Sequence, residues 1–146
     1  MSDARIGPAA AGDIDVVRQL LVQAGLPEAG LLDQFPAAYV VARRGPEIVG
    51  VAGLEAYGRT GLLRSVAVVP ALRGCGIGQT LVADRIAVAR ANGLEVIYLL
   101  TTTAADYFRA VGFVPASREE APAELAACPE LAGACPASAT CLALHL

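Results

Sequence analysis

The segment RGCGIG, from Arg73 to Gly78, holds the residues whose types and spacing most directly suggest chemistry. It stands between an apolar, strand-like run and a long helix-like run. Glycines allow successive backbone N–H groups to point into a concave nest, and a helix beginning near Ile77 adds the positive end of its dipole. Such a loop can hold a diphosphate, whereas the alternative is a tight turn that binds no ligand. Three glycines beside an arginine exceed what a turn needs, so the sequence favours a phosphate site.

Two common nucleotide-binding loops match this segment poorly. A Walker A loop requires a lysine that reaches the β and γ phosphates, and all eleven basic residues of this chain are arginines. A dinucleotide-binding loop has the spacing G-x-G-x-x-G after the first strand of a βαβ unit. Here the spacing is G-x-G-x-G, and three strand candidates precede it. The missing lysine excludes the first class, and the spacing argues against the second.

Length and charge limit the remaining function classes. A chain of 146 residues is the size of one domain, so residues 1–146 are expected to form a single unit. The net charge of −3 and the scattered arginines argue against a nucleic-acid partner. No apolar run reaches the roughly 18 residues of a membrane span, and the segment MSDARIGPAA does not resemble a signal peptide. We expect a cytoplasmic protein with no nucleic-acid or membrane partner.

The cysteines and the single histidine do not form a zinc-binding pattern. Cys75, Cys128, Cys135 and Cys141 include no C-x-x-C pair, and His145 is next to the last residue. We therefore expect free thiols and no metal site. The last three cysteines raise one alternative, a thiol-based arsenic-binding protein, because three thiolates can bind trivalent arsenic.

Hydrophobic periodicity and turn residues place the glycine loop in a mixed sheet. Expected strands are a short one in ARIGPA, then 37–43, 47–56, 62–69, 95–100 and a last one in SATCLALHL. Expected helices are one in DIDVVRQLLVQAG, a short turn at 27–33, 77–92, and one ending at Gly112. Short glycine-bearing turns make 37–69 an antiparallel meander, and the helix at 77–92 makes the next strand pair parallel. The tail from 115 to 136 gives no clear assignment.

The loop and this order of elements resemble the GNAT N-acetyltransferases. VAVVPALRGCGIGQTLV is similar to that family's acetyl-CoA signature, R/Q-x-x-G-x-G/A, through Arg73, Gly76 and Gly78. AADYFRAVGF is similar to the family's next helix and Gly-Phe strand entry, through Gly112 and Phe113. The resemblance implies an α/β GNAT fold: a mixed, mostly antiparallel sheet with a splayed parallel strand pair and helices on both faces. GLEAYGRTGLLRSVAV, YLLTTTAADYF and CPASATCLAL further resemble GNAT proteins encoded in arsenic-resistance operons.

The resemblance also implies how the cosubstrate acetyl-CoA binds. Its pantetheine arm would enter between the splayed strands and its pyrophosphate would lie on the amides of the glycine loop. A strand amide near Val66 or Val68 would stabilise the oxyanion, and the amine would attack the thioester directly, without metal or acyl-enzyme. The donor-binding residues implied are Val66, Ala67, Val68, Arg73, Gly74, Cys75, Gly76, Ile77, Gly78, Gln79, Thr101 and Phe108.

Acid–base and substrate roles have fewer candidates. Glu55 is the candidate base, because a carboxylate beside the acetyl site can accept the amine proton directly or through a water; the alternative is a partner for Arg64. Arg64 and Ser65 are candidates for binding the acceptor, because arginine can hold a carboxylate bidentately. Many family members place a tyrosine where this chain has Phe108. Tyr107 is adjacent but turned by about 100° along a helix, so either Tyr107 or solvent protonates the leaving thiolate.

Together these observations predict an acetyl-CoA-dependent N-acetyltransferase. Its acceptor would be a small amine, either amino-acid-like or arsenical. The alternative on the same fold is a non-catalytic acyl-CoA sensor, which the absent tyrosine and histidine leave open. The resemblance further implies that two copies could pair through their last strands as a homodimer, with SATCLALHL as the candidate edge of the sheet.

Overall fold

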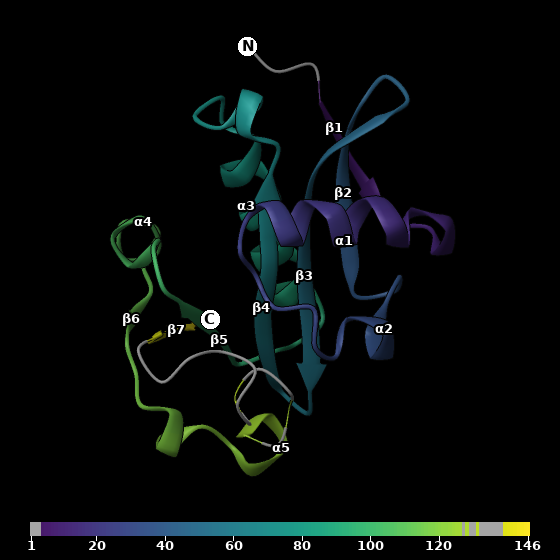
Figure 1. The fold of residues 1–146 in the computed structure, drawn as a ribbon. Coiled ribbons are helices and arrows are strands. Elements are labelled where there is room, and N and C mark those ends of the chain that lie inside the picture. Colours follow the sequence, from purple (N-terminus) through teal and green to yellow (C-terminus); the bar gives the residue numbers. More distant parts are fainter. Residues whose placement is uncertain (1–3, 127, 129–130, 132–138) are drawn as a thin grey trace.

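The computed structural model (Figure 1) describes residues 4–126, 128, 131 and 139–146. The strands of this part are β1 (Arg5–Pro8), β2 (Tyr39–Arg44), β3 (Glu47–Tyr57), β4 (Thr60–Val68), β5 (Val96–Thr101), β6 (Val114–Pro115) and β7 (Thr140–His145). The helices are α1 (Ile14–Gln23), α2 (Leu31–Gln34), α3 (Ile77–Ala91), α4 (Ala105–Val111) and α5 (Ala123–Ala126). Short 3₁₀ turns lie at Ala11–Asp13, Pro70–Leu72 and Arg118–Glu120.

The strands of the described residues form one seven-stranded sheet in the order β1-β2-β3-β4-β5-β7-β6. β4 and β5 are parallel, and the other neighbouring pairs are antiparallel. The meander from β2 to β4 and the parallel crossover through α3 confirm the sequence-based prediction. From β2 to β5 the largest difference in bounds is two residues, at the starts of β2 and β4, whereas the short helical turn expected at 27–33 is α2 at Leu31–Gln34.

The last strand differs from its expected place at the edge of the sheet. β7 lies between β5 and β6, with Val114 and Pro115 of β6 opposite Ala143 and Leu142. After α4 the chain turns at Gly112, which has φ +120°. It then forms β6, which pairs with the side of β7 that faces away from β5. The outermost strand on this side is therefore the two-residue β6. The unassigned tail contributes β6, the turn at Arg118–Glu120 and α5.

α1 and α3 cover opposite faces of the sheet (Figure 1). The apolar residues of α1 recur at a helical spacing, and Val17, Leu20 and Leu21 are buried against Val51 and neighbouring strand residues. On the other face α3 and α4 pack on the sheet through a second set of residues: Leu81, Val82, Ile86, Ala89 and Phe108. This two-sided cover explains why the central strands are apolar on both faces.

The parallel strands pair over only a short distance and then separate. Residues Thr60–Leu62 of β4 are opposite Val96–Tyr98 of β5. Beyond this point β4 continues beside β3 to Val68, and β5 continues beside β7 to Thr101. The two strands therefore diverge toward the end of the sheet at which α3 begins.

β4 carries a bulge at the point where the strands diverge. Val51 of β3 is opposite Ala67, but Gly53 is opposite Arg64, so β4 has one residue more than β3 in this interval. Ser65 within the bulge has φ +58°, the left-handed conformation that is uncommon for residues other than glycine. No pattern in the sequence predicts this bulge.

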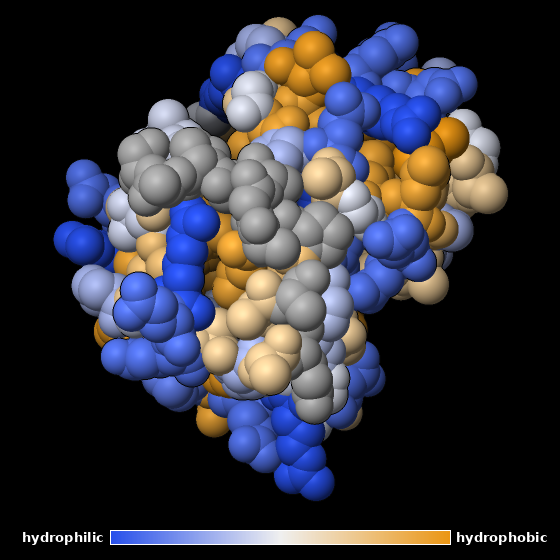
Figure 2. All heavy atoms as spheres, turned by 60° about the horizontal axis from the view of Figure 1, so that its bottom comes forward, coloured by the Kyte–Doolittle hydropathy of each residue, from blue (hydrophilic) through white to orange (hydrophobic). Residues whose placement is uncertain are grey.

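Large hydrophobic side chains are exposed in several parts of the described surface. Figure 2 shows one face, on which hydrophobic residues are visible in several places between hydrophilic ones. Among the described residues, the large hydrophobic side chains that are most exposed come from α1, α2, α4 and β6: Val16, Val22, Leu32, Val111 and Val114. Scattered exposure of this kind is normal for a folded protein.

Candidate active site

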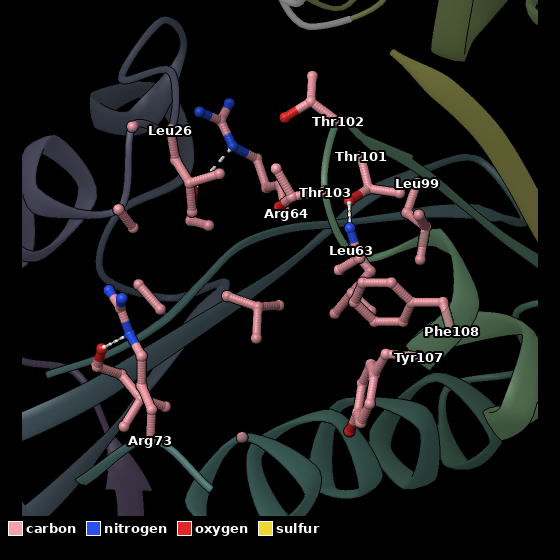
Figure 3. Close-up of a pocket in the computed structure, with 18 of the residues that line it drawn as sticks. Leu26, Leu63, Arg64, Arg73, Leu99, Thr101, Thr102, Thr103, Tyr107 and Phe108 are labelled. Carbon is pink, nitrogen blue, oxygen red and sulfur yellow. Dashed lines mark hydrogen bonds between the residues drawn. The ribbon is translucent and has the colours of Figure 1, made fainter. Parts of the chain in front are cut away.

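The diverging ends of β4 and β5 bound a cleft of about 940 Å³. Its walls come from β4, the glycine loop with the first turn of α3, the end of β5 with the start of α4, and the connection after α1. Figure 3 shows Arg64 and Arg73 on one side of the cleft, and Thr101, Tyr107 and Phe108 on the other.

Most of the predicted site residues line this cleft. They are Arg64, Ser65, Val66, Ala67, Val68, Arg73, Gly74, Gly76, Gly78, Gln79, Thr101, Tyr107 and Phe108. Glu55, Cys75 and Ile77 are not among the described residues that line it. The fold therefore brings the donor-binding and acceptor-binding candidates to one cleft and leaves the candidate base outside its walls.

The glycine loop has the geometry of an anion-binding turn. Gly74 and Gly76 have φ +81° and +89°, and α3 begins directly afterwards at Ile77. The first N–H groups of a helix have no partner within it, and they lie at the positive end of its dipole. Arg73 donates from Nε to the carbonyl of Val68 at 3.1 Å, which fixes its guanidinium beside the loop. The loop and Arg73 together fit a diphosphate.

Two predicted donor-binding residues have other surroundings. Cys75 is an exposed free thiol on the outside of the loop. Ile77 is buried in the core between α3 and β2–β3, where it anchors the first turn of the helix. Cys128 and Cys141 are buried cysteines, and Cys135, the third cysteine of the arsenic-binding alternative, lies outside the described residues.

Glu55 lies at the centre of a buried polar cluster. Its Oε2 accepts a hydrogen bond from the hydroxyl of Tyr39 at 3.0 Å, and its Oε1 accepts one from Tyr57 at 2.8 Å. Nη1 of Arg64 lies 3.6 Å from Oε2, and both side chains of this ion pair are almost fully buried. Glu55 is thus the partner of Arg64, the alternative that the sequence left open.

The tyrosines of this cluster have perturbed pKa values. Desolvation by burial raises the pKa of Tyr39 above its ordinary value of 10.0; Arg64 partly offsets this rise and Glu55 adds to it. The pKa of Tyr57 is raised chiefly by desolvation and then by its hydrogen bond to Glu55. Both hydroxyls therefore remain protonated donors to the carboxylate at neutral pH.

Arg64 connects this cluster to the wall of the cleft. Its Nε donates to Oγ of Ser65 at 3.1 Å. Its Nη1 donates to the carbonyl of Ala29 at 2.7 Å and its Nη2 to the carbonyl of Pro27 at 3.2 Å. The side chain is buried, yet it borders the cleft. Arg64 therefore contacts both the polar cluster around Glu55 and the connection between α1 and α2.

The opposite wall contains the two aromatic candidates. Phe108 is buried and packs edge-on against Phe113 and Tyr107. The hydroxyl of Tyr107 is buried without a hydrogen-bond partner, and burial raises its pKa. Figure 3 shows this hydroxyl directed toward a helix below the cleft rather than across it. Oγ1 of Thr101 accepts a hydrogen bond from the amide of Ala104 at 3.0 Å, so it also shapes the turn before α4.

Sequence reasoning missed part of the cleft. The connection after α1 contributes Gly25, Leu26 and Pro27, and the turn after β5 contributes Thr102 and Thr103. In the sequence, Gly25 and Pro27 indicate only that a helix ends there. No local pattern relates this connection to β4, because the two segments are about forty residues apart and meet only in the folded chain.

Comparison with known proteins identifies the family. The model described as "Acetyltransferase (GNAT) family" matches residues 16–114, which include β2 to β5, the glycine loop, α3 and α4. The chain belongs to the acetyltransferase (GNAT) family. This result confirms the family and the fold expected from the sequence, whereas it does not address the arsenic-resistance subtype.

Individual relatives agree with this membership. An "Amino-acid acetyltransferase" of Ectopseudomonas mendocina (strain ymp) is 46% identical over 63 residues, which are 43% of this chain and 15% of that protein. N-acetylglutamate synthase from Neisseria gonorrhoeae, complexed with coenzyme A and N-acetyl-glutamate, has a TM-score of 0.85 at 23% identity, over all of this chain and 36% of the other. Rv2747 from Mycobacterium tuberculosis, in a complex that contains CoA, has a TM-score of 0.78 at 23% identity, over 97% and 99% of the two chains. The chain thus spans only a minor part of the first two relatives.

Two further findings concern metals and membranes. Within the described part of the chain, no group of three or more His, Cys, Asp and Glu side chains is arranged to hold a metal ion. Among the helices of the same residues, none has the length and apolar character needed to cross a bilayer.

Proposed function

We propose that the protein transfers an acetyl group from acetyl-CoA to the amine of a small, amino-acid-like acceptor. The observation that carries the proposal is the cleft between β4 and β5, which ends at a glycine loop and the first turn of α3. Membership of the acetyltransferase (GNAT) family supports the reaction type. The chain also has the fold of a part, 36%, of a synthase whose structure contains coenzyme A and N-acetyl-glutamate.

The donor would bind along the floor of the cleft. The amides from Gly74 to Gln79 and the guanidinium of Arg73 suit the pyrophosphate, because both provide donors at a helix N-terminus. Beyond Leu62, β4 is no longer paired with β5, so its backbone groups on that side face the cleft. These groups, around Val66 to Val68, can form hydrogen bonds with the pantetheine arm.

The reaction needs few protein groups. The attacking amine forms the new C–N bond while the C–S bond of the thioester breaks, so the amine loses a proton and the thiolate gains one. A strand N–H near Val66 or Val68 would donate to the oxygen on which charge develops. For the thiolate we favour protonation by solvent, because the hydroxyl of Tyr107 is buried against the protein. A base role for Glu55 would need a water to connect its carboxylate with the cleft.

The acceptor would bind near the bulge of β4. Arg64 and Ser65 border the cleft there, and arginine suits the carboxylate of an amino acid. The names of the relatives favour an amino acid, since one is an amino-acid acetyltransferase and another was solved with N-acetyl-glutamate. An arsenical amine, and membership of the arsenic-resistance subtype, remain predictions from the sequence. A cytoplasmic location and a homodimer also remain predictions.

Steady-state turnover tests the proposal. The protein is incubated with acetyl-CoA and a panel of amines, comprising acidic, neutral and basic amino acids, an arsenical amino acid, a polyamine and an aminoglycoside. Release of the free CoA thiol is followed with a thiol reagent. We expect amino acids to accelerate release above the background without amine. Tight binding of acetyl-CoA with no acceleration by any amine would contradict the proposal and favour the sensor alternative.

A further inference from the structure

The carboxylate of Glu55 has more polar partners than a simple ion pair provides. It accepts two tyrosine hydrogen bonds, from Tyr39 and Tyr57, besides facing Arg64. Burying charged groups in this way is costly unless each is well satisfied. A cluster of this kind, lying directly behind the wall of a cleft, requires a role.

Neighbouring positions are adapted to this cluster. A Cβ added to Gly53 would lie 2.7 Å from Cζ of Tyr39, so only glycine allows that ring to cross β3 and reach Glu55. The left-handed Ser65 forms the bulge of β4 and accepts a hydrogen bond from Nε of Arg64. The orientation of Arg64 is thus fixed from two directions, by the carboxylate and by the bulge.

Arg64 transmits this orientation to the connection between α1 and α2. The guanidinium donates to the carbonyls of Pro27 and Ala29, at 3.2 and 2.7 Å. Leu26 and Pro27 of the same connection line the cleft. The position of this part of the wall therefore depends on where the guanidinium is held.

We infer that Glu55 is a positioning residue, which acts through Arg64 on the acceptor side of the cleft and not on the reacting amine. Tyr39 and Tyr57 hold the carboxylate, the carboxylate holds Arg64, and Arg64 holds the connection at residues 24–30. The part of this inference that concerns acceptor binding rests on the proposed function. The part that concerns residues 24–30 does not.

Kinetics of Glu55→Gln test the first part. The amide can still accept from a tyrosine but no longer carries the charge that faces Arg64, so we expect the KM for the acceptor to rise about tenfold. The kcat, the Kd of acetyl-CoA and the shape of the pH–rate profile are expected to stay within about twofold of the wild type. A fall in kcat with an altered pH–rate profile and an unchanged KM would identify Glu55 as the base and overturn the inference.

Hydrogen exchange tests the second part without requiring activity. In Glu55→Gln, exchange should become faster in the peptide that covers residues 24–31, including the amides of Leu26 and Leu31, and should be unchanged in α3. Tyr57→Phe, which keeps both charges, should show a smaller change of the same kind and serves if Glu55→Gln does not fold. Glu95→Gln is the matched control, because Glu95 forms an exposed ion pair with Arg59 at 3.0 Å.

The two parts fail separately. Unchanged exchange at residues 24–31 in both Glu55→Gln and Tyr57→Phe would overturn the inference, even if the enzyme is active. The same result in Glu95→Gln as in Glu55→Gln would also overturn it, because the effect would then not depend on this cluster. If the wild type acetylates no amine, the proposed function fails, and the exchange measurement alone decides whether Glu55 positions the connection.

Discussion

At the scale of single residues, Gly76 is the position in the proposed acetyl-CoA site where the backbone conformation favours glycine. It precedes α3 with φ +89°, and a Cβ added there would meet no heavy atom within 4 Å. Valine at this position would be strained by its backbone and would project two methyl groups toward the proposed diphosphate. We therefore expect Gly76→Val to weaken acetyl-CoA binding by about 100-fold or more in isothermal titration calorimetry.

Gly93 provides a matched control for this substitution. It follows α3 with φ +77°, has equally open surroundings, and does not border the cleft. Gly93→Val should lower the free energy of unfolding about as much as Gly76→Val does, because both glycines have a left-handed backbone. It should leave the Kd of acetyl-CoA within about twofold of the wild type. Equal losses of acetyl-CoA binding in both variants would contradict the assignment of the glycine loop.

Tyr107 is the residue whose role the structure makes most testable. Its hydroxyl is buried without a partner, and an unsatisfied buried polar group costs about 1–3 kcal/mol. Tyr107→Phe should therefore leave the melting temperature unchanged or higher, and kcat should remain within about threefold if solvent protonates the thiolate. A loss of kcat of about 100-fold or more would instead make Tyr107 the general acid.

At the scale of elements, the β3–β4 pair is the part of the sheet that connects stability with the site. Its bulge at Ser65 shifts the pairing of β4 with β3 by one residue, and Arg64 beside the bulge faces Glu55 of the polar cluster. Tyr39 from β2 completes the cluster by crossing Gly53. Three neighbouring strands therefore contribute to one buried polar unit.

The two tyrosines of this cluster predict how the free energy of unfolding changes at alkaline pH. The pKa of Tyr39 in the folded protein is raised above 10.0, so above pH 10 the unfolded chain releases a proton that the folded chain retains. Stability is thus full below pH 10 and falls as the pH rises, by up to about 1.4 kcal/mol per pH unit for this group. Tyr57 acts in the same direction and less strongly, because it is more exposed.

Urea unfolding between pH 8 and pH 11 checks this dependence. Tyr39→Phe should lower the free energy of unfolding at pH 8, by about 1 kcal/mol for its lost hydrogen bond. The same variant should show a shallower decrease above pH 10 than the wild type. An equally steep decrease would mean that Tyr39 does not contribute to the alkaline loss of stability.

The regular elements could be predicted from the sequence, whereas the irregular ones could not. The periodicity of residues 77–92 indicates a helix, and this helix is α3. The glycine-bearing turns between 43 and 62 indicate an antiparallel meander, and β2 to β4 form it. The bulge could not be predicted, because a serine gives no signal for a left-handed backbone. The tail after Pro115 is rich in alanine and proline without periodicity, so neither the turn at Arg118–Glu120 nor α5 was expected.

At the scale of the whole molecule, the described residues that line the cleft lie within three separate segments, 23–27, 63–79 and 99–108, together with Ala139. The second segment contains the motif, so its residues were expected at the site. The first was missed because it meets β4 only in the folded chain, where Ala24 and Leu26 pack on the core and Arg64 donates to the carbonyls of Pro27 and Ala29. Glu55 was expected at the site because it lies in the strand beside the expected acetyl site, but its side chain is held by hydrogen bonds from Tyr39 and Tyr57.

The central claim is that this cleft transfers acetyl groups from acetyl-CoA to an amino-acid-like amine. The most direct measurement is the stoichiometry of products, with N-acetylated amine quantified by mass spectrometry and free CoA thiol quantified in the same sample. We predict that the wild type forms both in a one-to-one ratio and that Gly76→Val forms neither above background. Release of CoA without acetylated amine, or equal product from both proteins, would contradict the account.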